Sequence, residues 1–163
     1  MTPELIANGI SLTVLLAYIV PLAFYMYTQD ATYLCILIAV ILIGILVEQI
    51  KPLFDSPRPE GAHACGLFCD GGDVTGRPGF PSGHVAITTL FVLLMAAYQS
   101  PFWLLGLVWI GLMAWSRYEK HCHSVNQVLA GFVTGSIGAG LSIVIYQATM
   151  LYKFIDLLAT VVD

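Results

Sequence analysis

Charged residues are scarce in this chain of 163 residues. Asp, Glu, Lys and Arg make up 10% of the sequence, whereas 58% of the residues are hydrophobic. Soluble domains of this size usually carry about 25% charged residues. The chain therefore has too little polar surface to cover a water-soluble globule, which excludes a cytosolic enzyme or a secreted domain.

Basic residues are fewer still. Six Lys and Arg against ten Asp and Glu give a net charge of −4, so there is no basic face for a nucleic-acid backbone and we expect no nucleic-acid partner. No Lys or Arg precedes the first hydrophobic run, which is also longer than the apolar part of a signal peptide. We therefore expect this run to be a membrane span.

Long stretches without any formal charge make up most of the sequence. They cover residues 5–29, 31–47, 85–116 and 124–152. A helix needs ~20 apolar residues to cross the hydrocarbon core. Because every backbone polar group must be paired internally within lipid, these stretches predict helices.

The first two stretches each predict a single helix. The first contains Pro21, where we expect a kink, and the second ends near Lys51. After the last stretch, residues 151–162 carry apolar side chains at helical spacing but include Lys153 and Asp156. This tail is too short for a sixth crossing and predicts a separate interfacial helix.

The two later stretches predict three more helices. Residues 85–116 are too many for one crossing, and Tyr-Gln-Ser-Pro at 98–101 divides them into a helical hairpin with arms reaching Ser82 and Arg117. The next helix starts near His123. The predicted fold is all-α, a polytopic transmembrane bundle of about five spanning helices plus the interfacial helix, in one membrane-embedded domain over residues 1–163.

An odd number of crossings places the two termini on opposite sides of the membrane. The loops 51–82 and 117–124 then lie on the side of the N-terminus. Five of the six Lys and Arg residues and all four His lie in or beside these loops. The sequence therefore predicts one polar site where the helices meet water.

The cations of this site fit a phosphate group. Arg58 and Arg117 offer planar forks that match phosphate oxygens, and Lys51 adds a point charge. The backbone amides of Ser82 and Gly83, at a helix start, are expected to donate to an oxyanion, assisted by the helix dipole.

Two histidines accompany the cations. His84 follows Gly83 at the start of one helix, and His123 lies at the start of another. Two imidazoles beside a phosphate site suggest one nucleophile and one proton donor.

Three motifs carry most of this information. They are Lys51-x6-Arg58-Pro59, Pro81-Ser82-Gly83-His84 and Ser116-Arg117-x5-His123. In order, spacing and placement at helix ends they resemble the signatures of the phosphatidic acid phosphatase type 2, or lipid phosphate phosphatase, superfamily. The second motif alone is a weak signal, whereas the three together are specific.

The resemblance implies a role for each matching residue. His123 would attack phosphorus and form a phosphohistidine, and His84 would protonate the leaving oxygen and then help to activate water. The phosphoryl oxygens would be held by Lys51, Arg58, Ser82, Gly83 and Arg117. No metal or other cofactor is implied. The usual core has six helices, so this chain would lack one at the N-terminus, which could reshape lipid entry or favour a homo-oligomer.

Gln127 departs from the family pattern, which usually has Asp four residues after the nucleophilic His. In serine proteases, replacing such an Asp by an amide costs ~10⁴ in rate through the wrong tautomer. A Gln carbonyl can keep the tautomer without the charge, and Glu119 is an alternative source of that charge. Branches resembling dolichyl-diphosphatase and glucose-6-phosphatase carry Gln here. We therefore expect activity to survive and isoprenyl diphosphates to be favoured over phosphatidic acid.

Ordinary structural explanations also exist. Basic residues at helix ends anchor them in headgroups, Ser82 is a typical N-cap, and isolated interfacial histidines such as His121 are usually structural. The joint spacing of the motifs favours phosphate binding, and His63 is left open. Glu48, near the end of the second helix, is expected to pair with Lys51.

Small residues and cysteines complete the pattern. Gly131 and Gly135 predict close packing of the last helix against another helix of the same chain rather than a second protomer. A zinc site formed by the sequences 63–69 and 121–123 would consume His123, so no metal is expected. A bond between Cys65 and Cys69 depends on an oxidising compartment.

These observations converge on a membrane phosphatase. We expect it to hydrolyse a lipid phosphate or isoprenyl diphosphate drawn from the bilayer, and the resemblance places the site on the extracytoplasmic or lumenal side. The alternatives are an inactive member that binds phospholipid headgroups and, ranked last, a small transporter or channel subunit.

Overall fold

The computed structural model describes residues 2–63, 72–98 and 103–162, with side chains for 2–63, 72–98 and 104–153. Within these residues the chain is helical, with no β-strand beyond two isolated bridges. The α-helices are α1 (Pro3–Leu12), α2 (Leu16–Thr28), α3 (Ala31–Ile50), α4 (Gly83–Ala97), α5 (Trp103–Glu119) and α6 (Val125–Val162), and the 3₁₀ turns are Thr13–Leu15 and Lys51–Leu53. The all-α fold class is confirmed.

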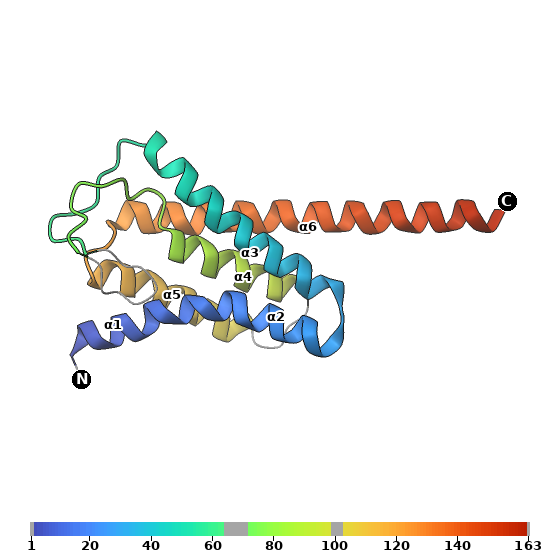
Figure 1. Cartoon of the computed structure of the whole chain (residues 1–163), viewed down its shortest axis with the longest axis horizontal. Helices are drawn as coiled ribbons and strands as arrows, with labels where there is room; N and C mark the ends of the chain where they lie inside the picture. Colours follow the sequence, from blue (N-terminus) through green and yellow to red (C-terminus); the bar gives the residue numbers. More distant parts are fainter. Residues whose placement is uncertain (1, 64–71, 99–102, 163) are drawn as a thin grey trace.

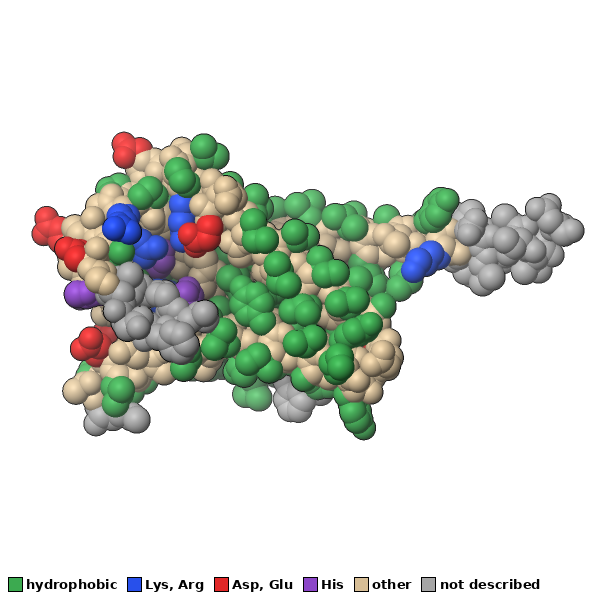
Figure 2. All heavy atoms as spheres, in the orientation of Figure 1, with side chains coloured by type: hydrophobic (Ala, Val, Ile, Leu, Met, Phe, Trp, Pro, Cys, Tyr) green, Lys and Arg blue, Asp and Glu red, His purple; other side chains and the backbone are tan. Residues whose placement is uncertain are grey.

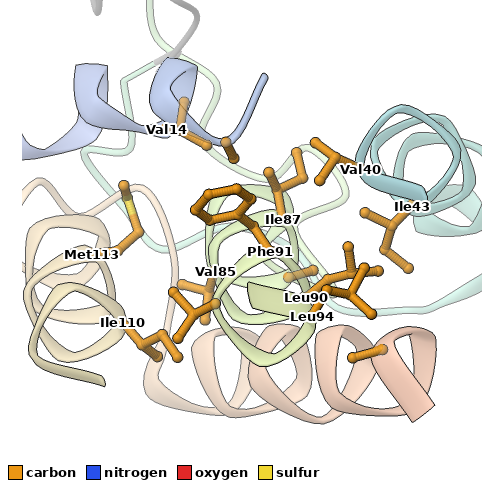
Figure 3. Packing of buried hydrophobic residues seen from close by; sticks show 14 of the residues in the cluster. Val14, Val40, Ile43, Val85, Ile87, Leu90, Phe91, Leu94, Ile110 and Met113 are labelled. Atoms are coloured by element: carbon orange, nitrogen blue, oxygen red, sulfur yellow. The ribbon is translucent and has the colours of Figure 1, made fainter. Parts of the chain in front are cut away.

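Helix α4 lies at the centre of the bundle. It packs against α3, α5 and α6, while α1 packs on α5 and α2 on α3 (Figure 1). Its buried side chains Val85, Leu90 and Leu94 point toward neighbouring helices, with Ile43 of α3 among their partners (Figure 3). The position of α4 matters for function, because its first residues belong to the Pro-Ser-Gly-His motif.

The glycines of α6 bring this helix close to α4. A Cβ atom on Gly131 would lie 2.5 Å from the carbonyl oxygen of Ser82, and one on Gly135 would overlap the carbonyl group of Ala86. Only a residue without a side chain allows this approach. The prediction that the small residues pack within the same chain is confirmed.

Among the described residues, three helical segments are long and apolar enough to cross a membrane. They are Pro3–Thr28, Ala31–Leu53 and Val125–Lys153, and α4 is a shorter apolar helix. Hydrophobic side chains cover the middle of the face in Figure 2, and most charged groups gather at one end. The chain is therefore a membrane protein, and five crossings stay a prediction.

One local prediction is wrong. The predicted separate tail helix does not exist, because α6 continues without a break to Val162 (Figure 1).

The first span contains the 3₁₀ turn Thr13–Leu15, while Pro21 lies inside helix α2, where the kink stays a prediction. The Thr13 hydroxyl donates to the carbonyl of Ile10 at 2.6 Å and accepts a bond from the Trp109 indole at 2.7 Å.

The predicted helix ends are otherwise close to those observed. Helix α3 ends at Ile50, α4 begins at Gly83, α5 ends at Glu119 and α6 begins at Val125. The N-terminus lies at the same end of the bundle as the α3–α4 and α5–α6 connections, and the C-terminus lies at the far end (Figure 1). The hairpin break at 99–102 lies outside the described residues.

Candidate active site

Lys51 and Arg58 enter the site from the α3–α4 connection. Lys51 begins the 3₁₀ turn after α3, is 8% exposed and pairs with Glu48, as predicted. Arg58 donates from Nη1 to the carbonyl oxygen of Cys122 at 3.0 Å. This bond joins the connection after α3 to the turn that carries His123.

The connection folds back on itself before it reaches α4. Pro57 and Pro78 form an antiparallel bridge, and the Gly79 amide donates to the Ser56 carbonyl at 3.0 Å. A Cβ atom on Gly79 would lie 2.6 Å from Oε1 of Gln127 and 2.8 Å from Cγ of Arg58. Glycine is therefore required where this segment passes over the site.

The start of α4 supplies an anion-binding helix end. Ser82 is the N-cap by position, yet its Oγ makes no capping bond and is buried without a hydrogen-bond partner among the described residues. Its backbone amide donates to the Gln127 carbonyl at 2.9 Å. This amide is therefore already paired in the structure, and the hydroxyl of Ser82 and the amides from Gly83 onward are the other donors at this helix start. Donation to an oxyanion stays a prediction.

Arg117 lies at the end of α5 and is almost fully buried, at 1% exposed. Its Nη1 donates to Oγ of Ser11 in α1 at 2.9 Å, and Ser11 Oγ lies 3.3 Å from Oγ of Ser116. Helix α1 thus orients a guanidinium of the site. Ser11 is a functional neighbour that the sequence analysis did not identify, because one serine in an apolar helix is an ordinary occurrence.

A tight turn after α5 delivers His123. The backbone amides of Cys122 and His123 both donate to the Arg117 carbonyl, at 3.1 and 3.3 Å. His121 has a φ of 52° and an exposed side chain, which agrees with its predicted surface position. Cys122 is disulfide-bonded, so its sulfur is not available as a thiolate ligand. The Cys65–Cys69 bond, which the sequence analysis left dependent on the compartment, lies outside the described residues.

Gln127 fixes the tautomer of His123. Its amide nitrogen donates to the Ser56 carbonyl at 3.1 Å and the Pro57 carbonyl at 2.9 Å, which sets the orientation of the amide. Oε1 therefore faces Nδ1 of His123 at 3.2 Å and also accepts the Ser124 amide. Because Oε1 can only accept, Nδ1 carries the proton and Nε2 keeps its lone pair.

The surroundings keep this imidazole neutral. Burial lowers the pKa of His123 well below its ordinary value, and the positive charges of Arg58 and Arg117 lower it further, whereas the Gln127 hydrogen bond acts in the opposite direction. At pH 7 the ring is therefore uncharged. His84 and His123 are close enough to act on each other electrostatically.

Residues 32–151, most of the chain and all of the residues above except Ser11, match the family model described as the PAP2 superfamily. The chain belongs to the PAP2 superfamily. Members of this superfamily are phosphatases, so this PAP2 protein is a phosphoric ester hydrolase. Comparisons with curated proteins and with solved structures gave no match.

The PAP2 chain has a further cation that the sequence analysis assigned to no role. Nζ of Lys120 is buried and has no hydrogen-bond partner among the described residues. Its charge acts on His84, whereas the charges that act on His123 are those of Arg58, Arg117 and Lys51. Lys120 falls at an unspecified position of the third motif, so the motif gave no signal for it.

Some predicted candidates lie apart from the site of the PAP2 protein. Glu119 is exposed, and its charge is not among those that act on His123. The described hydrogen-bond partner of the His123 ring is Gln127. His63 is exposed and forms a backbone bridge with Asp73. Among the described residues, no group of three or more His, Cys, Asp or Glu is arranged to hold a metal ion.

Proposed function

We propose that this PAP2 protein is an integral membrane phosphatase that hydrolyses a lipid phosphate or isoprenyl diphosphate through a phosphohistidine at His123. One observation carries the proposal. A neutral imidazole, with Nδ1 bound to Gln127 and Nε2 free to attack, lies among Lys51, Arg58 and Arg117. This is the arrangement that a nucleophile toward phosphorus needs.

The first step transfers the phosphoryl group to the protein. The Nε2 lone pair of His123 forms a bond to phosphorus, and the bond between phosphorus and the leaving oxygen breaks. His84, which takes up a proton together with the anionic substrate, gives that proton to the leaving oxygen. His84 is the second residue of α4 and only partly buried, which leaves it accessible to a headgroup at the helix end.

The second step restores the protein. A water molecule gives one proton to His84, and its oxygen attacks phosphorus while the bond to Nε2 breaks. His123 returns to its neutral form with the proton still on Nδ1, hydrogen-bonded to Oε1 of Gln127. The net reaction consumes one water and releases phosphate and the dephosphorylated lipid.

The cations stabilise the charge that accumulates on phosphorus. Lys51, Arg58 and Arg117 present ammonium and guanidinium groups, and the α4 amides add partial positive charge. In metal-dependent phosphoryl transfer, divalent ions supply this stabilisation. Here side chains that donate hydrogen bonds and do not ligate metals fill that role, so we propose a metal-independent reaction.

An apolar groove supports a lipid substrate. It has a volume of about 720 Å³, lies between α3, α4 and α6, and is lined mainly by aliphatic side chains such as Leu42, Leu90 and Leu141. Its lining includes Gln49 and Leu46, which precede Lys51 by two and five residues. A hydrocarbon tail in this groove would leave its headgroup beside the site.

The position of Lys120 favours a lipid diphosphate over a lipid monophosphate as the substrate. Its buried ammonium acts on His84, the proposed donor to the leaving group. A leaving group that is itself a phosphate would carry negative charge toward this side. An alcohol leaving group, as from phosphatidic acid, would give the buried ammonium no counter-charge.

The decisive test is phosphate release by the detergent-solubilised protein in the presence of EDTA. The substrates are isoprenyl diphosphates, isoprenyl monophosphates, phosphatidic acid and a water-soluble sugar phosphate. We expect turnover of the lipids, fastest for the diphosphates, and little turnover of the sugar phosphate. Loss of activity with EDTA would contradict the metal-independent mechanism, and phosphate binding without turnover of any substrate would favour the headgroup-binding alternative.

A further inference from the structure

A carboxylate lies where the substrate phosphate is proposed to bind. Oε1 of Glu48 is 2.5 Å from Nζ of Lys51. The same oxygen lies 3.6 Å from the position that a Cβ atom would take on Gly83, at the start of α4. Its charge also acts on the guanidinium of Arg58. Three of the proposed phosphate ligands thus have Glu48 as a shared anionic neighbour.

We propose that Glu48 sets the anion affinity of the site, because its carboxylate holds the anion position until a phosphate of more than one negative charge displaces it. The inference rests on the proposed function, because it assigns the same residues to phosphate binding. Glu48 acts on substrate binding through Lys51 and contacts no reacting atom.

The two partners differ in how easily they can move. The side chain of Glu48 is 65% exposed, whereas that of Lys51 is 10% exposed. Glu48 can therefore swing into water with little loss of burial, while Lys51 stays in place and needs a new anion. A phosphate entering the site supplies that anion.

The headgroups of the surrounding bilayer compete with the substrate for this anion position. Diester headgroups carry one negative charge, are present at high local concentration and surround a site at the membrane boundary. Exchanging the tethered carboxylate for such a monoanion gains no charge and loses an intramolecular contact. A terminal phosphate carries about −1.5 to −2 at pH 7, so its exchange gains electrostatic energy with Lys51 and Arg58.

The test compares Glu48→Gln with Glu60→Gln, an exposed carboxylate of the same connection that the structure places in no site contact. Binding of orthovanadate, inorganic phosphate and dimethyl phosphate is measured by calorimetry, which does not depend on turnover. The cost of displacing Glu48 is the same for every anion, so we expect Glu48→Gln to tighten the binding of dimethyl phosphate, phosphate and orthovanadate each about tenfold, and Glu60→Gln to change none of them. Unchanged affinities in Glu48→Gln would overturn the proposal.

Kinetics provide a second measurement with the lipid substrate. Glu48→Gln should lower KM and raise inhibition by phosphatidylglycerol in mixed micelles, with kcat within about twofold of wild type. A large fall in kcat with unchanged KM would show a role in chemistry and contradict the proposal. If Glu48→Gln does not fold, Glu48→Asp, which is too short to hold Lys51 in the same geometry, should show a gain in anion affinity of the same direction.

The outcomes separate this inference from the proposed function. Absent lipid turnover in the wild-type protein would refute the phosphatase proposal, while the calorimetric comparison would still decide the role of Glu48. Normal turnover with unaltered anion affinities in Glu48→Gln would refute the role of Glu48 alone.

Discussion

Replacing His123 by alanine should reduce kcat by at least about 10⁴-fold and remove any phosphorylated protein intermediate. The variant lacks the only proposed nucleophile. Gln127 keeps its bond to the Ser124 amide in this variant, so the local fold should survive. Phosphate release and acid-quenched protein labelling with ³²P-substrate measure the two effects.

His123→Asn is the matched control for packing. The side-chain amide can replace Nδ1–H as the donor to Oε1 of Gln127, but it provides no lone pair in the position of Nε2. It should therefore be as inactive as the alanine variant and close to wild type in Tm. A labelled intermediate in His123→Asn, or turnover near that of the wild type, would show that the nucleophile lies elsewhere.

Gln127→Glu has the second-largest expected effect, although the two side chains have nearly the same shape. The Gln127 amide nitrogen donates to the carbonyls of Ser56 and Pro57, and a carboxylate in its place would face these two oxygens with a negative charge. Loss of these buried bonds should cost about 2–4 kcal/mol of stability. We also expect kcat to fall by more than about tenfold, because His123 loses its orientation.

Thermal unfolding and lipid phosphate turnover are the measurements for this variant. Ser56→Ala serves as its control, because it removes the hydroxyl acceptor at 3.1 Å and leaves both backbone carbonyl acceptors in place. Its effect should be small. Wild-type stability together with equal or higher activity in Gln127→Glu would mean that the amide is a handicap and that a carboxylate suits the site better.

These contacts show where sequence analysis succeeded and where it ended. Charge-free runs located the helices, because lipid forces apolar segments to pair their backbone groups internally. The motifs placed Lys51, Arg58 and Arg117 at helix ends, and the structure places them at one end of the bundle. The predicted separation of the tail from α6 was wrong because residues 141–162 contain no proline or glycine to stop a helix.

The motifs did not predict the contacts that hold Arg117 and Gln127 in place. Ser11 joins Arg117 across 106 positions, and Ser56 joins Gln127 across 71. Serines are common, and nothing in their local sequence distinguishes these two. Likewise, the amide of Ser82 is used by the Gln127 carbonyl because α6 approaches α4 at Gly131, a close contact that only the folded chain reveals.

The central claim is that residues from four helix ends form one phosphate-sized pocket, and a structure with bound orthovanadate tests it most directly. We predict vanadium bound axially to Nε2 of His123, with a ring nitrogen of His84 within about 3 Å of the opposite apical oxygen. Lys51, Arg58 and Arg117 should contact the remaining oxygens. Vanadate bound away from His123, or with His84 out of reach of its oxygens, would contradict the account.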